Sequence, residues 1–225
     1  MYKRRPNKTY YFSVEGETEQ WYLQWLQEII NKFETLTFQV AIKAKVEKNP
    51  FKYAKSMPII QKTEIYHLSD FESNEAIHEK QFIETMDNMK KAMKDKQINY
   101  KFGYSNLTFD LWIVLHRSDC NSSLTHRRNY INQLNSNFSE KFINMDEFKK
   151  ECNFKRCLQK LQITDVIEAV SRAKAINQRN CDNGYTLHEY KGYKYYKENP
   201  SLNIWEAIDK ILIDCEIEKK DQKTN

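Results

Sequence analysis

Two hydrophobic segments of this chain end in carboxylates. Residues 10–14 are aromatic or apolar except for Ser13, and Glu15 and Gly16 follow directly. Residues 63–68 form a second such segment, followed by Ser69, Asp70, Phe71 and Glu72. Each segment is typical of a buried strand, and open α/β sheets build their sites beyond the carboxyl ends of their strands. Acidic side chains at two such ends favour a site for a divalent cation.

The carboxylates have the chemistry that such a cation requires. Mg²⁺ prefers oxygen ligands, and one or two protein carboxylates with substrate phosphate oxygens can suffice. Glu15, Asp70 and Glu72 are the first candidates. Asp70 and Glu72 are two residues apart, and an extended backbone would point both side chains to one side. Polar strand ends without chemical consequence are the alternative. Glu19 is a further catalytic candidate, although an acid in the first turn of a helix is also explained by the helix dipole.

The order of the expected elements indicates an α/β protein. A helical stripe follows Gly16, residues 38–46 fit a strand, residues 51–56 a short helix, residues 74–96 a long helix and residues 98–104 a further strand. This alternation predicts a mostly parallel sheet flanked by helices. We expect a core over residues 1–120. Residues 121–225 are expected to be a helical elaboration packed on it, with helices over residues 124–135, 145–161, 163–179 and 201–218.

Composition excludes several classes of protein. The four glycines are too far apart for a P-loop or a dinucleotide-binding fingerprint. No segment reaches the roughly 18 apolar residues of a membrane span, and no apolar signal segment follows the basic N-terminus. The five scattered cysteines include no CxxC pair, which is typical of a reduced cytoplasmic protein. The net charge of +5 is only a weak indication of a nucleic-acid partner.

Residues 105–116 carry a third group of candidates. Ser105 or Asn106 could cap a helix over residues 107–116, and the amides of such a helix start could bind a phosphate. Capping and packing alone are the alternative. Asp110 would lie in the first turn, either as an acid favoured by the dipole or as another metal ligand. His116 follows an apolar stretch, so it is either a core histidine or a catalyst.

An aromatic and basic segment follows at residues 185–196. Lys191, Tyr193 and Lys194 belong to a mixture of rings and cations that can hold single-stranded nucleic acid, since rings stack on bases and lysines neutralise phosphates. The alternative is an amphipathic segment whose tyrosines cover the core.

The motifs resemble those of the RloB-like (AbiLii-type) phage-defence proteins, which have a TOPRIM-like core. The matching pieces are residues 15–19 (EGETE), residues 70–72 (DFE), residues 105–116 (SNLTFDLWIVLH) and residues 199–203 (NPSLN). The segment over residues 105–116 is the specific one. Three positions depart from the family pattern: Glu72 stands for its usual Asp, Leu107 for its Pro and Asp110 for its Glu.

The resemblance implies an antiviral nuclease that depends on Mg²⁺, with Mn²⁺ as the alternative ion. RNA is favoured over DNA as substrate, tRNA included, and a partner AAA/ABC-type ATPase and a homo-oligomer are implied. Carried over, Glu15 would be the general acid/base or a metal ligand, and Asp70 and Glu72 would hold the ion. Two other functions stay open: a non-catalytic module that docks the ATPase, and an RNA-binding module.

Overall fold

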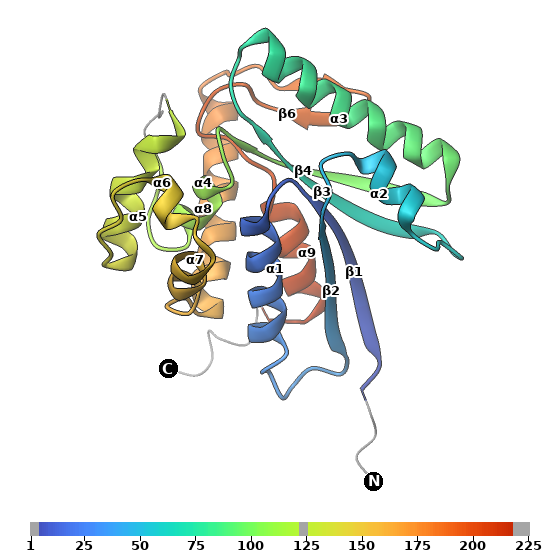
Figure 1. The fold of residues 1–225 in the computed structure, drawn as a ribbon, viewed down its shortest axis with the longest axis horizontal. Helices are drawn as coiled ribbons and strands as arrows, with labels where there is room; N and C mark the ends of the chain where they lie inside the picture. Colours follow the sequence, from blue (N-terminus) through green and yellow to red (C-terminus); the bar gives the residue numbers. More distant parts are fainter. Residues whose placement is uncertain (1–4, 122–125, 218–225) are drawn as a thin grey trace.

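A four-stranded, all-parallel sheet forms the centre of the protein (Figure 1). The computed structural model describes residues 5–121 and 126–217. The strands are β1 (Asn7–Val14), β2 (Gln39–Val46), β3 (Thr63–Phe71) and β4 (Ile98–Asn106), in the order β2-β1-β3-β4. The predicted α/β class with a mostly parallel sheet is confirmed.

Helices cover both faces of this sheet. α1 (Glu17–Ile30) packs on β1 and β2, whereas α2 (Pro50–Ser56) and α3 (Ala76–Asp95) pack against each other on the opposite face (Figure 1). This division follows from the strand order, because a right-handed crossover that moves in one direction puts its helix on one face and a crossover in the reverse direction uses the other. Loops follow the strands at the end of the sheet that is formed by their carboxyl ends.

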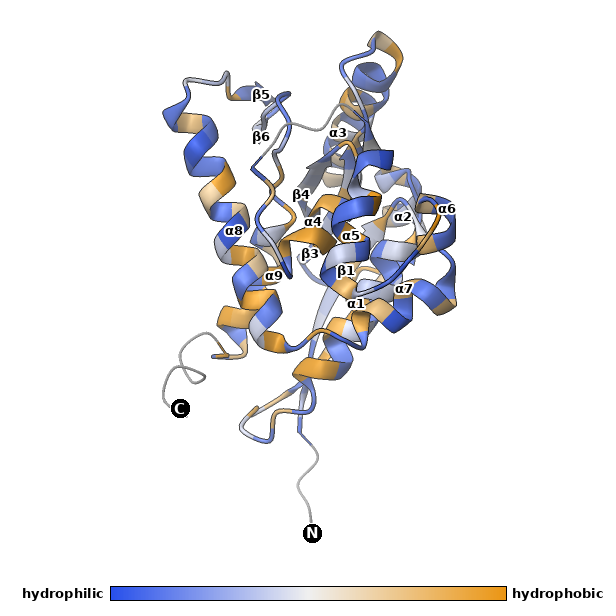
Figure 2. Cartoon of the chain, turned by 90° about the vertical axis from the view of Figure 1, so that its left-hand side faces the viewer, coloured by the Kyte–Doolittle hydropathy of each residue, from blue (hydrophilic) through white to orange (hydrophobic). Residues whose placement is uncertain are grey.

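The second half of the chain is mainly helical, as predicted. It contains α4 (Asp110–Leu115), a 3-10 turn (Arg127–Asn129), α5 (Tyr130–Phe138), α6 (Met145–Phe148), α7 (Glu151–Leu158), α8 (Ile163–Asp182) and α9 (Trp205–Asp214). Figure 2 shows α4 as almost entirely hydrophobic, and its residues 110–115 are all buried. None of the helices in the described ranges combines the length and apolar character that a bilayer crossing needs.

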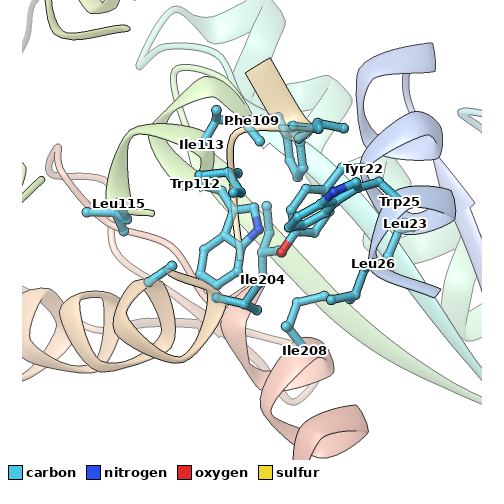
Figure 3. Close-up of a cluster of buried hydrophobic side chains, with 14 of the residues drawn as sticks. Tyr22, Leu23, Trp25, Leu26, Phe109, Trp112, Ile113, Leu115, Ile204 and Ile208 are labelled. Carbon is cyan, nitrogen blue, oxygen red and sulfur yellow. The ribbon is translucent and has the colours of Figure 1, made fainter. Parts of the chain in front are cut away.

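The larger hydrophobic core is shared by the two halves of the chain. Tyr22 and Leu26 of α1 pack with Trp112 of α4 and with Ile204 and Ile208 at the C-terminal end (Figure 3). Each of these side chains is 0–1% exposed. Full burial of one such side chain contributes about 1.5–3 kcal/mol, so the helical region is part of what holds the sheet in place.

Several predicted boundaries are corrected. β3 continues past Leu68 to Phe71, so Asp70 lies within the strand. The helix predicted over residues 107–116 begins only at Asp110, because Leu107 has a left-handed backbone (φ 62°) that no helix continues. The helix predicted over residues 145–161 is broken between α6 and α7. The helix predicted over residues 201–218 begins at Trp205.

Two further differences concern the remaining segments. The aromatic segment over residues 185–196 forms a hairpin, β5 (His188–Tyr190) and β6 (Tyr193–Tyr195). The helix predicted over residues 124–135 is α5, which starts at Tyr130 and runs to Phe138; residues 124 and 125 lie outside the described ranges.

Candidate active site at the carboxyl ends of the strands

The candidate site lies where the sheet changes direction. β1 and β3 are neighbours, yet the chain leaves β1 towards β2 and leaves β3 towards β4. Ligands of open α/β sheets bind outside the strand ends at such a switch point. Glu15 follows the last residue of β1, and Asp70 is the penultimate residue of β3. The two carboxylates chosen from the sequence therefore lie on the two strands that flank the switch point.

Glu15 is tied directly to the end of β3. The Ser69 hydroxyl donates a hydrogen bond of 2.6 Å to Glu15 Oε1. Burial raises the pKa of Glu15 and the negative charge of Glu19 adds to this, whereas the bonds from Ser69 and the Asp70 amide and the charge of Lys48 oppose it. Glu15 is thus a carboxylate whose proton affinity is increased by its surroundings.

Glu19 turns back from the first turn of α1 towards Gly16. Its side chain is 5% exposed, and Thr18 Oγ1 donates a hydrogen bond of 2.9 Å to Oε2. A Cβ atom at Gly16 would lie only 3.0 Å from the same Oε2. Burial raises the pKa of Glu19, although its own amide and Thr18 oppose the rise. Gly16 therefore provides the space into which this carboxylate folds.

This contact gives a first prediction. In Gly16→Ala, the new methyl group should displace the Glu19 carboxylate and lower any metal-dependent activity of the protein at least tenfold. The free energy of unfolding should fall by only about 1 kcal/mol, because alanine is a poorer helix cap than glycine. Thermal unfolding and a cleavage assay measure the two effects.

Gly16→Ser is the matched variant. Serine restores a good cap but carries the same Cβ atom, so stability should return and activity should not. Full activity in Gly16→Ser would contradict a role for this close approach.

The pKa of Asp70 is affected by each of the charged groups around it. Its pKa is raised well above the ordinary value, first by burial and then by the charges of Glu19 and Glu15, with a smaller contribution from Asp110. The Lys149 ammonium acts in the opposite direction. Like charges in a poorly solvated place disfavour one another's ionisation. Glu15, Glu19, Asp70 and Asp110 therefore form one electrostatic unit, which we call the carboxylate cluster.

Asp110 and Lys149 form the only ion pair of this cluster given by the described residues. Asp110 is fully buried, and its Oδ2 accepts hydrogen bonds from Thr108 Oγ1 (2.8 Å) and Lys149 Nζ (2.9 Å). Burial alone would lower the Lys149 pKa, but Asp110, Asp70 and Glu19 raise it overall. Asp110 Oδ1 is buried without a hydrogen-bond partner among the described residues. An acceptor of this kind suits a further cation or donor.

The donor chemistry of the cluster fits a hard cation, since it consists of carboxylate oxygens with an unpaired acceptor at Asp110. Within residues 5–121 and 126–217, however, no three His, Cys, Asp or Glu side chains are already arranged around a common ion position. Side-chain rotation would be needed before these carboxylates shared one ion. A cavity of ≈ 340 Å³ beside Glu15 and Asp70 offers room for a ligand.

Glu72 lies at the wall of this cavity but outside the cluster. β3 ends at Phe71, so the strand alternation that would align Glu72 with Asp70 does not continue. The Glu72 carboxylate faces His78 Nε2 at 3.5 Å, and His78 Nδ1 shares a hydrogen bond of 2.7 Å with the Ser73 hydroxyl. The structure therefore brings together Glu15, Glu19, Asp70 and Asp110 and turns Glu72 towards α3.

His116 is enclosed in the aromatic core. It is 1% exposed, its Nε2 lies 3.1 Å from the Tyr22 hydroxyl and its Nδ1 lies 2.9 Å from the Trp112 carbonyl oxygen. Burial lowers the His116 pKa to about 4. Both ring nitrogens are used within the core, which corresponds to the core-histidine alternative.

Ser105 and Asn106 hold the main chain instead of facing solvent. Both are at most 1% exposed. Ser105 Oγ donates to the Thr108 carbonyl (2.8 Å), and the Asn106 amide group donates to the carbonyls of Tyr196 and Glu198. The main-chain amide of Asn106 also donates to the Ser201 carbonyl (2.9 Å), so this amide is already paired within the protein.

The hairpin rings also face inwards. Tyr193 is 8% exposed, and its ring packs edge-on against Phe102. Lys191 pairs with Asp87, and Lys194 is exposed with Glu189 at 4.0 Å. This arrangement matches the alternative in which the tyrosines cover the core, so Tyr193 is not available for base stacking here.

Sequence reasoning missed Lys149, Lys48 and His78 at this site. Lys48 is the second residue after β2, so a search of all the strand ends could have found it. Lys149 had no local signal, because it lies in a polar run that resembles a solvated helix face.

Comparison with known families agrees with the sequence motifs. A family model described as RloB-like protein matches residues 10–211. The chain belongs to the RloB-like family. Neither the search of curated proteins nor that of solved structures gave a match. The matched segment of this RloB-like protein includes every member of the carboxylate cluster and Lys149, while the match itself names no TOPRIM core and no activity.

Proposed function

We propose that this RloB-like protein is a metal-dependent phosphodiesterase that cleaves nucleic acid in antiviral defence, with RNA, tRNA included, as the favoured substrate. The observation that carries the proposal is that Glu15 and Asp70 line one cavity at the switch point of a parallel sheet, where the charges of Glu19 and Asp110 help to raise the Asp70 pKa. Such mutual repulsion is costly to maintain without a cation, and perturbed carboxylates of this kind cluster at functional sites. The defence role and the RNA preference rest on the family resemblance.

In this proposal Glu15, Glu19, Asp70 and Asp110 would hold Mg²⁺ or Mn²⁺. When bound, the ion would polarise the phosphate and stabilise charge on the leaving oxygen. Glu15 is the best candidate for a proton acceptor, because its raised pKa brings it closer to neutrality and Ser69 fixes its orientation. Lys48 beside the cavity supplies a cation for the substrate backbone.

A second candidate is a non-catalytic module that docks a partner ATPase. Two observations favour it: no three ligands are prearranged in the described ranges, and Lys149 already neutralises Asp110. This function requires partner binding that survives loss of the carboxylate cluster.

Incubation of the purified chain with total tRNA tests the first function. Cleavage should require Mg²⁺ or Mn²⁺, stop with a chelator and fall by about 10²-fold in Glu15→Gln. Glu17→Gln is the matched control, because Glu17 is an exposed carboxylate only two residues further along the chain, at the start of α1.

The two candidate functions predict different results. Unchanged cleavage in Glu15→Gln would contradict the catalytic assignment. No cleavage of any RNA or DNA pool with either ion, together with ATPase binding by the Glu15→Gln protein, would support the docking module instead.

A further inference from the structure

One edge of the central sheet is partly uncovered. β4 is the last strand of the sheet, and only its carboxyl-terminal part is capped by the segment before α9. The Tyr104 amide donates to Asn203 Oδ1 (2.6 Å), the Asn203 amide donates to the Tyr104 carbonyl (2.9 Å) and the Asn106 amide donates to the Ser201 carbonyl (2.9 Å). The preceding part of the strand lacks such a neighbour in the described ranges.

The main-chain groups of this open part point outwards. In a parallel sheet, alternate residues of a strand direct their amide and carbonyl to the same side. Tyr104 directs both away from β3, so Phe102 and Tyr100 do so as well. The Tyr193 hydroxyl donates a long, buried hydrogen bond of 3.5 Å to the Tyr100 carbonyl, and among the described residues the amides of Tyr100 and Phe102 have no main-chain partner outside the sheet. An edge of this kind is a template for another strand.

A groove runs along this edge. A cavity of ≈ 550 Å³ is bounded by β4, the β5–β6 hairpin and residues of α3, α8 and α9. Its charged lining consists of Lys90, Lys101, Lys194 and Glu206. Lys101 lies in the open part of the strand, and Lys194 is 62% exposed. The groove is therefore positively charged, which complements an acidic ligand.

The rings of the groove favour a peptide over a nucleic acid. Tyr100, Phe102 and Tyr193 are 2–8% exposed, and the Tyr193 ring has the Lys90 ammonium 4.4 Å from its centroid. Bases need accessible ring faces on which to stack. A peptide strand needs only the outward amides and carbonyls of the edge. A second copy of the same edge is disfavoured, because it would bring Lys101 against an equally basic groove.

We propose that the open edge of β4 binds an acidic, extended segment of a partner protein by β-strand addition. Main-chain hydrogen bonds to Tyr100 and Phe102 would supply affinity, and Lys101 and Lys194 would select acidic side chains. This inference does not depend on the proposed nuclease function.

Fluorescence anisotropy with defined peptides tests the proposal. The probe is a labelled peptide of alternating Glu and Val. The comparison peptides carry Lys at each Glu position, or Pro at alternate positions, which removes main-chain donors. The full chain should bind the acidic peptide and bind both comparison peptides at least tenfold more weakly. Amide exchange at Tyr100 and Phe102 should slow when the acidic peptide is added.

Charge-reversed variants give the matched controls. Lys101→Glu should weaken binding of the acidic peptide at least tenfold, and Lys141→Glu should not, because Lys141 is an exposed loop lysine outside the groove. The proposal is overturned if the acidic peptide does not bind, if the proline peptide binds equally, or if both variants lose binding alike. Displacement of the peptide by a uridine-rich RNA with the same Lys101 dependence would assign the groove to nucleic acid.

Discussion

Asp70→Asn should abolish cleavage and at the same time stabilise the metal-free protein. We expect a loss of activity on the order of 10³-fold, because Asp70 interacts with all the other members of the cluster: the charges of Glu19, Glu15 and Asp110 each raise its pKa. Asparagine removes a charge that Glu19 and Glu15 repel. The free energy of unfolding, measured in a chelator at neutral pH, should therefore rise by about 1 kcal/mol. Thermal unfolding and the tRNA assay measure the two effects.

The stabilisation should depend on pH in a defined direction. The Asp70 pKa is raised on folding, so the native state binds more protons than the unfolded state. The stability of the wild-type protein therefore falls as pH rises from the ordinary aspartate range through the raised pKa. Asp70→Asn should match the wild type at acid pH and exceed it at neutral and alkaline pH.

Two comparisons make this prediction specific. Mg²⁺ should raise the unfolding temperature of the wild type but much less that of Asp70→Asn. Glu28→Gln removes an exposed carboxylate from α1 and should change neither activity nor the pH profile. A less stable Asp70→Asn protein at neutral pH would contradict the repulsion on which the site assignment depends.

The sequence predicted the parts of the site that follow from strand ends. One apolar run stops at Glu15 and another stops near Asp70. In a parallel sheet all the carboxyl ends of the strands lie at the same end of the sheet, so both residues are placed there. The same reasoning does not fix the direction of Glu72, because β3 ends at Phe71. Glu72 lines the cavity with Glu15 and Asp70 but faces His78.

Other parts depended on contacts between distant segments. Lys149 reaches Asp110 because the chain breaks between α6 and α7, and a polar run of residues carries no sign of that break. Ser105 and Asn106 looked like a helix cap, but the Ser105 hydroxyl and the Asn106 side-chain NH₂ group donate to main-chain carbonyls of residues 108, 196 and 198. His116 stayed ambiguous because its two partners come from different helices.

The second large effect is expected for Lys149→Met. Methionine keeps most of the side-chain volume but removes the ammonium, which leaves Asp110 buried and unpaired next to three other carboxylates. Breaking a buried pair in this way costs about 3–5 kcal/mol, and partial exposure of Lys149 (31%) reduces the expected loss of stability to about 2 kcal/mol. Denaturant unfolding in a chelator measures this loss.

A double variant separates the ion pair from the packing of Lys149. In Lys149→Met with Asp110→Asn, residue 110 no longer carries a charge that lacks its partner, so most of the lost stability should return, with a coupling energy of at least about 1 kcal/mol. Mg²⁺ should stabilise Lys149→Met more than the wild type, because the ion would replace the missing positive charge. Equal losses in the single and double variants would mean that Lys149 acts through packing alone, and the cluster would then not need a counter-ion from α6–α7.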